Sequence, residues 1–455
     1  MSSSTNSGSS PVRRRIAILA VSSLVSCIFF SAPMFRRIPI RNQLYDSKIE
    51  YEPPIEPVAV TVTVHAPKSI RTNDVNDLVR SEETLEFFKD RLRPELRYIT
   101  SWATQDWNSQ VLGFMNLMYL ALITERVAII PPFPPFVYND SVSPGLEFGE
   151  VFDMTRLQNG MRKPVLEWHQ VKDPLGTKVE VLGCWGNGLE TWKLSQYLNL
   201  DVSYTVAPNW TLFRPEEPHM SFWALASLAF PDSEQTENAE PSRMLGIAVK
   251  PEQQLLCFDD LSLASARNPR EYSQEMSPAW RFVGRHMHWS ARLQYIADLY
   301  TQKACGVGSE DPIPPYIAIY ARYSDPSSWC DLPVEECFPP LFMYARRVQE
   351  LKAEIRETMG IEVNRVIMTA DDEMESIWWE AVQKRGWSRL DHSRTVERYG
   401  LRYPLLIDAV VRSGALGFVT ADDSVTSVLA IRRVFSWQGG FAKRVPWETK
   451  LRQKP

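Results

Sequence analysis

Continuous apolar runs alternate with stretches of helical spacing in the second half of the chain. Runs of strand type lie at residues 316–321 (YIAIYA), 365–369 (RVIMT) and 415–420, and helical spacing is found at 341–359, 374–384, 403–412 and 424–435. Strands that alternate with helices in this way are typical of a parallel sheet with right-handed crossovers. Because the apolar runs are not interrupted by polar residues, we expect strands that are covered on both faces.

The first half of the chain begins with the same pattern. Residues 97–101 and 126–131 are strand-like runs, and residues 111–123 between them (VLGFMNLMYLALI) are apolar on nearly every side. A helix that is apolar all round is buried inside a large protein. The sequence therefore predicts an α/β fold with two Rossmann-like domains facing a cleft, at residues 82–308 and 309–447.

An uncharged apolar stretch of 20 residues lies at 16–35, which is about the length that a helix needs to span a bilayer. Three arginines precede it and two follow it, which favours slightly a cytoplasmic N-terminus. We expect a cytoplasmic tail at 1–15, a transmembrane signal anchor at 16–35 and a proline-containing stem at 36–81. The alternative is a cleaved signal peptide, because small residues follow the apolar run.

Composition excludes several classes of protein. The chain has 455 residues, of which 44% are hydrophobic, so it can bury a large core. With 50 Lys and Arg against 55 Asp and Glu, the net charge is -5, which argues against a dedicated nucleic-acid binder.

Cysteines and glycosylation sequons agree with a lumenal body. Beyond Cys27 in the expected anchor, five cysteines allow at most two intrachain disulfides with one thiol left over, at positions Cys184, Cys257, Cys305, Cys330 and Cys337. The alternative is that several of them are buried and reduced. Two sequons, at Asn139 and Asn209, are expected glycosylation sites.

Polar clusters follow three of the strand-like runs, at residues 105–110, 320–325 and 422–427. In open α/β sheets, ligands bind beyond the carboxyl ends of the strands. An arginine at a strand end, such as Arg322, and hydroxyls at a helix N-terminus, such as Ser424, can together hold a diphosphate. The alternative for each residue alone is structural, a salt bridge for Arg322 and a helix cap for Ser424.

Several segments resemble motifs of the fungal branch of the GDP-fucose protein O-fucosyltransferase-like family, which has the GT-B fold. The resemblance is carried by YIAIYARYSDPSSWC, RVIMTADDEMESIWWEAVQKRGWSRLDH, YPLLIDAVVRSGALGFVTADDSVTSVLAIRRVFSWQGG and WNSQVLGFMNLMYLALITERVAIIPPF. It covers approximately residues 95–135 and 315–445. The resemblance implies a glycosyltransferase of the Golgi or endoplasmic reticulum membrane, single-pass type II with a lumenal catalytic body, that transfers fucose from GDP-fucose with inversion.

The resemblance also implies roles for individual residues. Arg322 is the expected catalytic residue, because it would contact the β-phosphate and help to expel GDP. The remaining expected nucleotide-sugar-binding residues are Asn108, Gln110, Asp325, Asp371, Ser424 and Ser427. The family needs no metal, so we expect no cofactor beyond the donor; the acceptor is a protein or glycan hydroxyl that the motifs do not identify.

Several positions depart from the family pattern, among them residues 323 and 324, which replace an arginine and a glycine after Arg322. Tyr320 stands in place of a histidine, Ser109 in place of an asparagine, and Asp423 is a carboxylate where a diphosphate is expected to bind. The alternative function is therefore a catalytically inactive relative that serves as a lumenal binding or scaffolding protein.

Two other groups of polar side chains occur close together in the sequence. His286 and His288 would share one face of a strand, but no third metal ligand is evident, so surface or core histidines are favoured. Asp259 and Asp260 are expected to be solvated loop charges.

Overall fold

The computed structural model describes residues 73–81, 86–102, 106–138, 141–173, 176–186, 195, 197–214, 216, 218–230, 238–268, 271, 277–322, 337–370 and 376–446. All of these lie in the compact unit that spans residues 67–455. The expected anchor at 16–35 and the site residues Asn139, Asp325 and Asp371 lie outside the described residues. Within the described part of the chain, no helix combines the length and the apolar character that crossing a membrane requires.

The first half of the chain forms a sheet of six parallel strands. Their spatial order is β5 (Val165–Glu167), β2 (Val127–Ile130), β1 (Tyr98–Ser101), β9 (Leu255–Phe258), β6 (Glu180–Gly186) and β7 (Leu200–Val206). The neighbouring strands pair in parallel throughout, for example Tyr98 with Val127 on one side and with Leu255 on the other. Two small sheets accompany it, β3 (Phe136–Tyr138) with β4 (Ser141–Ser143) and β8 (Met220–Ser221) with β10 (Ala264–Ser265).

The second half forms a sheet of five parallel strands. Their order is β13 (Ser388–Arg389), β12 (Arg365–Ala370), β11 (Tyr316–Ala321), β14 (Gly417–Thr420) and β15 (Phe441–Arg444). The buried positions of β11 are continuous, as the apolar run predicted. The α/β class with parallel sheets is thus confirmed, and it is consistent with two Rossmann-like domains; the boundary at 308/309 stays a prediction.

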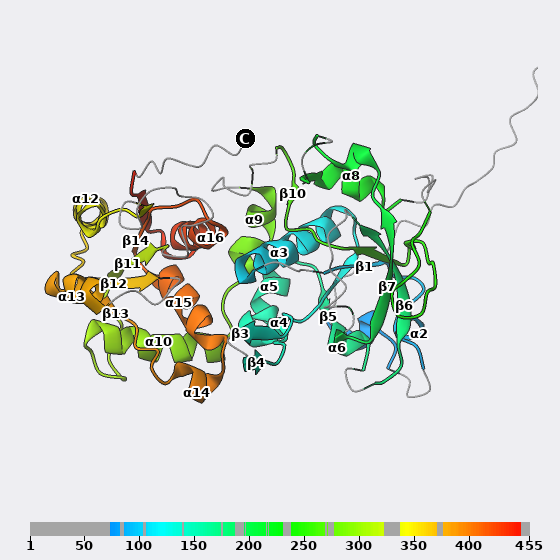
Figure 1. Cartoon of the computed structure of the whole chain (residues 1–455), viewed down its shortest axis with the longest axis horizontal. Coiled ribbons are helices and arrows are strands. Elements are labelled where there is room, and N and C mark those ends of the chain that lie inside the picture. The colour runs from blue at the N-terminus through cyan, green and yellow to red at the C-terminus, as the bar shows by residue number, and fades with distance from the viewer. Residues whose placement is uncertain are drawn as a thin grey trace, which may run out of the picture. The chain divides into compact units, whose positions relative to one another are not determined.

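Helices cover both sheets (Figure 1). Up to residue 305 the helices are α1 (Val75–Leu78), α2 (Phe88–Arg91), α3 (Trp107–Ile123), α4 (Phe148–Val151), α5 (Met154–Met161), α6 (Trp168–Val171), η1 (Asn209–Thr211), α8 (Phe222–Ser227), α9 (Pro278–Phe282), η3 (Gly284–His286) and α10 (Ala291–Cys305). In the second half they are α12 (Leu341–Met359), α13 (Ser376–Lys384), α14 (Thr395–Tyr399), α15 (Tyr403–Gly414), α16 (Val425–Arg433) and the π-helix η5 (Val434–Gln438).

The core has three parts that follow from these layers. One part contains α3, α15 and the residues of β1 and β11 that face them, such as Ile99 and Ala318. The opposite face of the first sheet packs against α6, and the opposite face of the second sheet packs against α12. Burial on both faces explains why the strands are apolar without alternation.

Four of the five expected cysteines lie among the described residues, and Cys330 does not. Cys184 and Cys257 form a disulfide between β6 and β9, and Cys337 is also disulfide-bonded. Cys305 is a buried free thiol, and burial raises its pKa.

Two expectations about polar groups were wrong. His286 ends the short helix η3 and is not on a strand, so it does not share a strand face with His288. Asp259 and Asp260 are each only 2% exposed, because they follow the central strand β9 and accept bonds from the backbone of residues 260 and 262.

Candidate functional site

The site is built at the carboxyl ends of two neighbouring strands, β11 and β14. The register pairs Tyr320 with Thr420, so the segments that follow the two strands leave the sheet side by side. Arg322 follows β11, and its side chain is 48% exposed. A guanidinium at this position can reach a ligand in solution.

Helix α16 begins beside Arg322 and supplies a polar N-terminus. Ser424 is the N-cap, and its hydroxyl accepts a hydrogen bond of 3.3 Å from the backbone N–H of Ser427. Ser427 is fully buried, and its hydroxyl bonds to Thr420 and donates to the carboxylate of Asp422. Ser424 is therefore the hydroxyl at the mouth of the helix, whereas Ser427 supports the turn beneath it.

The two aspartates before α16 have different partners. Asp422 lies 3.8 Å from the Arg322 guanidinium, and its side chain is 20% exposed. Asp423 forms an ion pair of 2.7 Å with Arg444 on β15, and its side chain is 65% exposed. The carboxylate that faces the expected phosphate position is thus Asp422, which the sequence interpretation did not single out.

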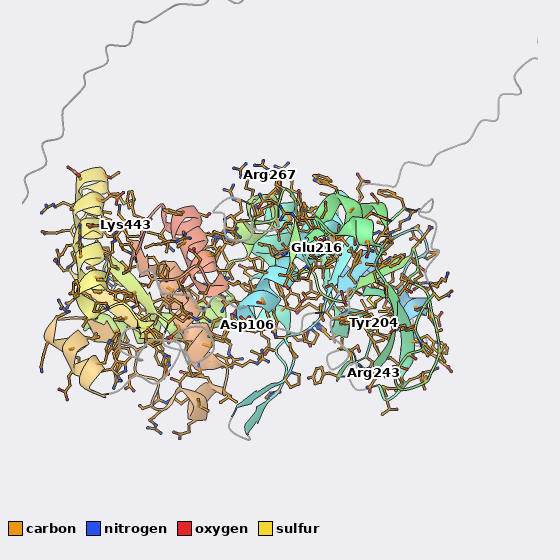
Figure 2. The ribbon with its side chains drawn as sticks, turned by 45° about the horizontal axis from the view of Figure 1, so that its top comes forward. Asp106, Tyr204, Glu216, Arg243, Arg267 and Lys443 are labelled. Carbon is orange, nitrogen blue, oxygen red and sulfur yellow. A yellow bond between two sulfur atoms is a disulfide. The ribbon has the colours of Figure 1, made fainter. Side chains whose placement is uncertain are left out.

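A second helix N-terminus meets α16. Asp106, labelled in Figure 2, caps α3. Its carboxylate accepts from the backbone N–H of Asn108 at 2.9 Å and from the hydroxyl of Ser109 at 2.7 Å. The Asn108 amide donates a hydrogen bond of 2.7 Å to the Thr426 hydroxyl in the first turn of α16. Residues that are far apart in the sequence, Asn108 and Ser424, are therefore brought to one place.

Gln110, one turn along α3, is 6% exposed and buried. Among the predicted residues, the structure brings Asn108, Arg322 and Ser424 together near solvent. Gln110 and Ser427 lie beneath them.

Tyr320, which replaces the family histidine, is part of the core below the site. It is 4% exposed, and the buried guanidinium of Arg412 from α15 lies 4.9 Å from its ring centroid. Arg412 also donates to the Thr369 hydroxyl at 3.3 Å. A cation beneath the strand ends adds positive potential to the site, and only the tertiary fold reveals it.

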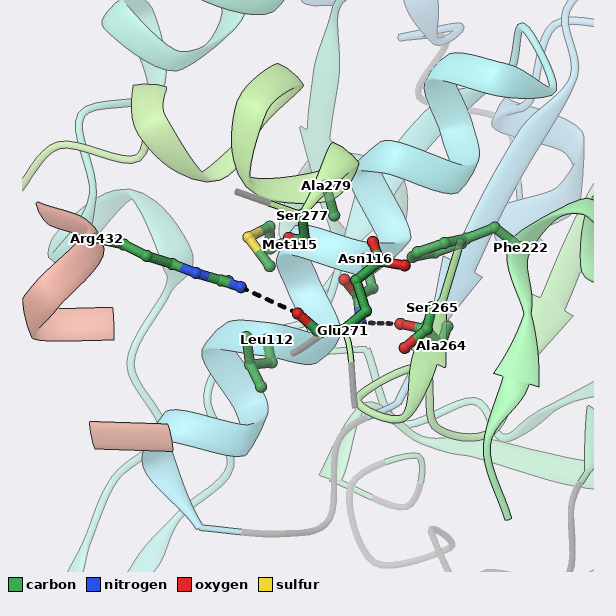
Figure 3. A pocket seen from close by; sticks show the side chains of 10 residues that line it. All are labelled: Leu112, Met115, Asn116, Phe222, Ala264, Ser265, Glu271, Ser277, Ala279 and Arg432. Carbon is green, nitrogen blue, oxygen red and sulfur yellow. Dashed lines mark hydrogen bonds between the residues drawn. The ribbon is translucent and has the colours of Figure 1, made fainter. Parts of the chain in front are cut away.

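A small cavity lies farther along α3 and α16 (Figure 3). Arg432 of α16 is 1% exposed and donates to the backbone carbonyl of Glu271 at 3.4 Å. The cavity is lined also by Asn116, Ser265 and Ser277. With a volume of about 10 Å³, it has room for a single water and not for a substrate.

One group of possible metal ligands occurs among the described residues, and it lies outside this site. Donor atoms of Glu147, Glu167 and His169 come within 4.8 Å of one another. Both carboxylates already cap short helices, Glu147 at α4 and Glu167 at α6. Burial raises the pKa of Glu167. The group is explained by capping and by the His169–Glu147 pair at 3.3 Å.

The positive groups of the site suit an anionic ligand, and one carboxylate of the protein opposes its binding. Arg322, the free end of α16 and the buried Arg412 attract a diphosphate. Asp422 competes for Arg322, because an anion and a carboxylate would lie within a few ångströms of the same guanidinium. The sequence carried no signal for this, since adjacent aspartates before a helix differ only in the direction of their side chains.

Comparisons with known proteins gave matches at the level of structure alone. No protein-family model matches the chain, and neither does any curated protein.

Among solved structures, the chain is similar to fucosyltransferases at low sequence identity. POFUT1 in complex with GDP has a TM-score of 0.49 and 14% identity, covering 78% of this chain and 99% of that chain. The fucosyltransferase NodZ from Bradyrhizobium has a TM-score of 0.37 and 11% identity, covering 74% and 92%. NodZ α-1,6-fucosyltransferase soaked with GDP-fucose has a TM-score of 0.35 and 10% identity, covering 74% and 93%.

Proposed function

We propose that this chain is a glycosyltransferase that binds GDP-fucose at the carboxyl ends of β11 and β14. The observation that carries the proposal is the exposed Arg322 beside the N-terminus of α16, at adjacent strand ends of one parallel sheet. A guanidinium fork and the backbone N–H groups at a helix N-terminus are two devices with which proteins bind diphosphates. The choice of GDP-fucose as the donor follows from the motif resemblance around Arg322 and α16.

In the proposed reaction, an acceptor hydroxyl attacks C1 of fucose on the face opposite to GDP. The bond between C1 and the β-phosphate oxygen breaks, and its electron pair stays on the departing GDP. The proton of the acceptor passes to the released diphosphate or to water. Arg322 stabilises the charge that grows on the leaving group, which is where a preorganised cation accelerates such a transfer.

A second candidate function is a non-catalytic relative that keeps the fold. The specific observation in its favour is Asp422, whose carboxylate lies 3.8 Å from Arg322 and replaces part of the charge that a phosphate would supply. In that case Arg322 and Asp422 form a structural pair, and the protein acts through binding to other molecules.

Calorimetric titration with GDP tests the proposal. Arg322→Lys should weaken GDP binding by at least about tenfold, because an ammonium cannot reproduce a bidentate fork. Arg346→Lys, in an exposed pair with Glu350 on α12, is the matched control and should leave the affinity unchanged.

The two candidates give different results in the same experiment. The transferase is supported if the wild type binds GDP, if Arg322→Lys weakens this binding, and if the wild type transfers fucose from GDP-fucose. A folded wild type that does not bind GDP, or equal affinity in a folded Arg322→Lys variant, contradicts it and favours the non-catalytic function.

A further inference from the structure

A second cavity lies away from the candidate site, near the amino end of β14. Its volume is about 220 Å³, and it is lined by residues of α5, α10, α15 and η5 together with His288 and Trp289. Gly414 at the end of α15 lines it, whereas the candidate site lies beyond Thr420 at the other end of β14. The cavity therefore lies at the amino ends of the strands of the second sheet, and the candidate site lies at their carboxyl ends.

A buried arginine stands behind the aromatic wall of this cavity. Arg433 is 3% exposed, and its guanidinium lies 4.3 Å from the Trp289 ring centroid and 5.4 Å from that of Trp437. In the described part of the chain it forms no hydrogen bond and no ion pair, and its buried Nε has no acceptor. A buried charge without a carboxylate partner is costly, and the two indole rings offset only part of that cost.

The lining of the cavity adds further positive charge. Arg156 on α5 lines it and has an exposed side chain. The N-terminal ends of α5 and α10 lie at the cavity, since Asp153, the N-cap of α5, and Gln294, near the start of α10, both line it. The carboxylate of Asp153 opposes these groups, but it is already used to cap α5, accepting from the backbone N–H of Arg156 at 2.9 Å.

Two carbonyl groups near the end of α15 are already paired. Gln438 donates to the carbonyl of Ser413 at 3.1 Å, and the Tyr316 hydroxyl donates to the carbonyl of Val411 at 2.7 Å. The negative end of this helix is therefore partly neutralised. The lining itself carries one carboxylate, Asp153, and one guanidinium, Arg156, and the additional positive charge is that of Arg433 behind the wall.

We propose that this cavity binds a small organic anion of monosaccharide size, whose carboxylate or phosphate pairs with Arg156. The volume is larger than a bare phosphate needs, and the Trp289 and Trp437 side chains in the wall suit an organic body. The positive charge of Arg433, which lies behind these two tryptophans, attracts the anion electrostatically without contacting it. The proposal is independent of the nucleotide-sugar site, because the two share no residue.

Thermal-shift titrations of the full chain at fixed ionic strength test the proposal with three probes. D-glucuronate carries a carboxylate, D-glucose 6-phosphate carries a phosphate, and D-glucose is the neutral control. At least one of the two anions should raise the melting temperature in a dose-dependent manner, and the anion that does so identifies the preferred group. D-glucose should give no shift.

Variants locate the binding. Arg156→Gln should weaken anion binding by roughly tenfold or more, the change expected for one charge-assisted hydrogen bond. Arg292→Gln, an exposed arginine of α10 that does not line the cavity, is the matched control and should leave binding unchanged. Circular dichroism checks that both variants fold.

A second measurement places the ligand within the cavity. The ring proton resonances of His288, which stacks on Trp437 at 4.3 Å, should shift on saturation with the anion. No stabilisation by either anion, an equal effect of D-glucose, or binding that Arg322→Lys abolishes and Arg156→Gln does not, would overturn the proposal.

Discussion

Asp422 and Asp423 are neighbours in the chain, but their carboxylates have different surroundings. Asp422 faces Arg322 at 3.8 Å, whereas Asp423 forms a 2.7 Å pair with Arg444. Repulsion of a bound diphosphate should therefore come from Asp422. At an effective dielectric constant of about 20 and a separation of about 5 Å, one charge pair amounts to about 3 kcal/mol before screening.

The pair offers a matched test at the scale of one residue. Asp422→Asn removes a charge, keeps an oxygen to accept from Ser427, and should raise GDP affinity about fivefold after screening by solvent reduces the effect to ~1 kcal/mol. Asp423→Asn should leave GDP affinity unchanged. Calorimetry on both variants decides the matter, and equal affinities in all three proteins would show that Asp422 does not oppose the ligand. Reduced GDP affinity in Asp422→Asn, together with a similar loss when a chelator is added to the wild type, would indicate a metal bridge instead.

At the scale of elements, a buried ion pair joins the segment after α6 to the first sheet. The Lys172 ammonium lies 2.6 Å from the Glu180 carboxylate at the start of β6, and their side chains are 7% and 6% exposed. Glu180 also accepts from the backbone N–H of Phe88 at 2.9 Å, which attaches α2 to the same point. One carboxylate thus holds three segments together.

Removal of the lysine should leave this carboxylate buried without its countercharge. Lys172→Met should lower the free energy of unfolding by about 3–5 kcal/mol. Lys384→Met, which removes an exposed pair with Glu380 at 4.0 Å, should lower it by less than about 1 kcal/mol. Urea unfolding of both variants measures the difference, and similar losses in the two would contradict the assigned role of burial.

At the scale of the whole molecule, several hydrogen bonds connect residues of the two halves of the chain. The Trp280 indole donates to Ser436 at 3.0 Å, the Trp437 indole donates to the backbone of Arg285 at 2.9 Å, Arg402 donates to the backbone of Pro134, and Asn108 donates to Thr426 at 2.7 Å. The bond from Asn108 to Thr426 holds the N-terminus of α16 beside that of α3. The candidate site therefore depends on the packing of the whole described unit.

His288 is part of this junction, and its titration should affect overall stability. Burial, together with the positive charges of Arg156, His286 and Arg433, lowers the pKa of His288 to about 4, although Asp153 opposes this. The unfolded chain, with a histidine pKa near ~6.5, binds more protons than the folded chain between these values. Stability should therefore fall as the pH decreases from about 6.5 to 4.

Urea midpoints measured across this range test the linkage. His288→Asn should reduce the loss of stability towards low pH, because the group that takes up the proton on unfolding is gone. The same pH dependence in wild type and His288→Asn would show that other groups cause the acid sensitivity.

We also propose the type II topology, with the N-terminus cytosolic and residues after the stem in the lumen of the Golgi or endoplasmic reticulum. Asn209 is exposed in η1, where an attached glycan would extend into solvent. An N-terminal tag should be found on the cytosolic side of the membrane. Treatment with a glycosidase should reduce the apparent mass of the wild-type protein, and the reduction should be smaller in Asn209→Gln. A lumenal tag on a protein that is never glycosylated would contradict the topology.

The sequence by itself determined most elements of the second half to within a few residues, whereas β13, α14 and β15 were not predicted. The expected strand at 316–321 and helix at 341–359 are β11 and α12, and Gly360 ends the helix with φ 68°. The expected helix at 403–412 extends to Gly414. Apolar periodicity and a terminal glycine are local properties, so they can be read without the fold.

Sequence reasoning was less accurate where partners come from distant parts of the chain. It treated His286 and His288 as strand residues and Asp259 as solvated, because local alternation and polarity do not reveal burial. It selected Arg322, Asn108 and Ser424, which the fold does bring near one another. It did not foresee that Asp422, rather than Asp423, faces Arg322. Side-chain direction in a loop is decided by tertiary contacts, here the pair of Asp423 with Arg444 on β15 and the hydroxyls of Thr420 and Ser427 around Asp422.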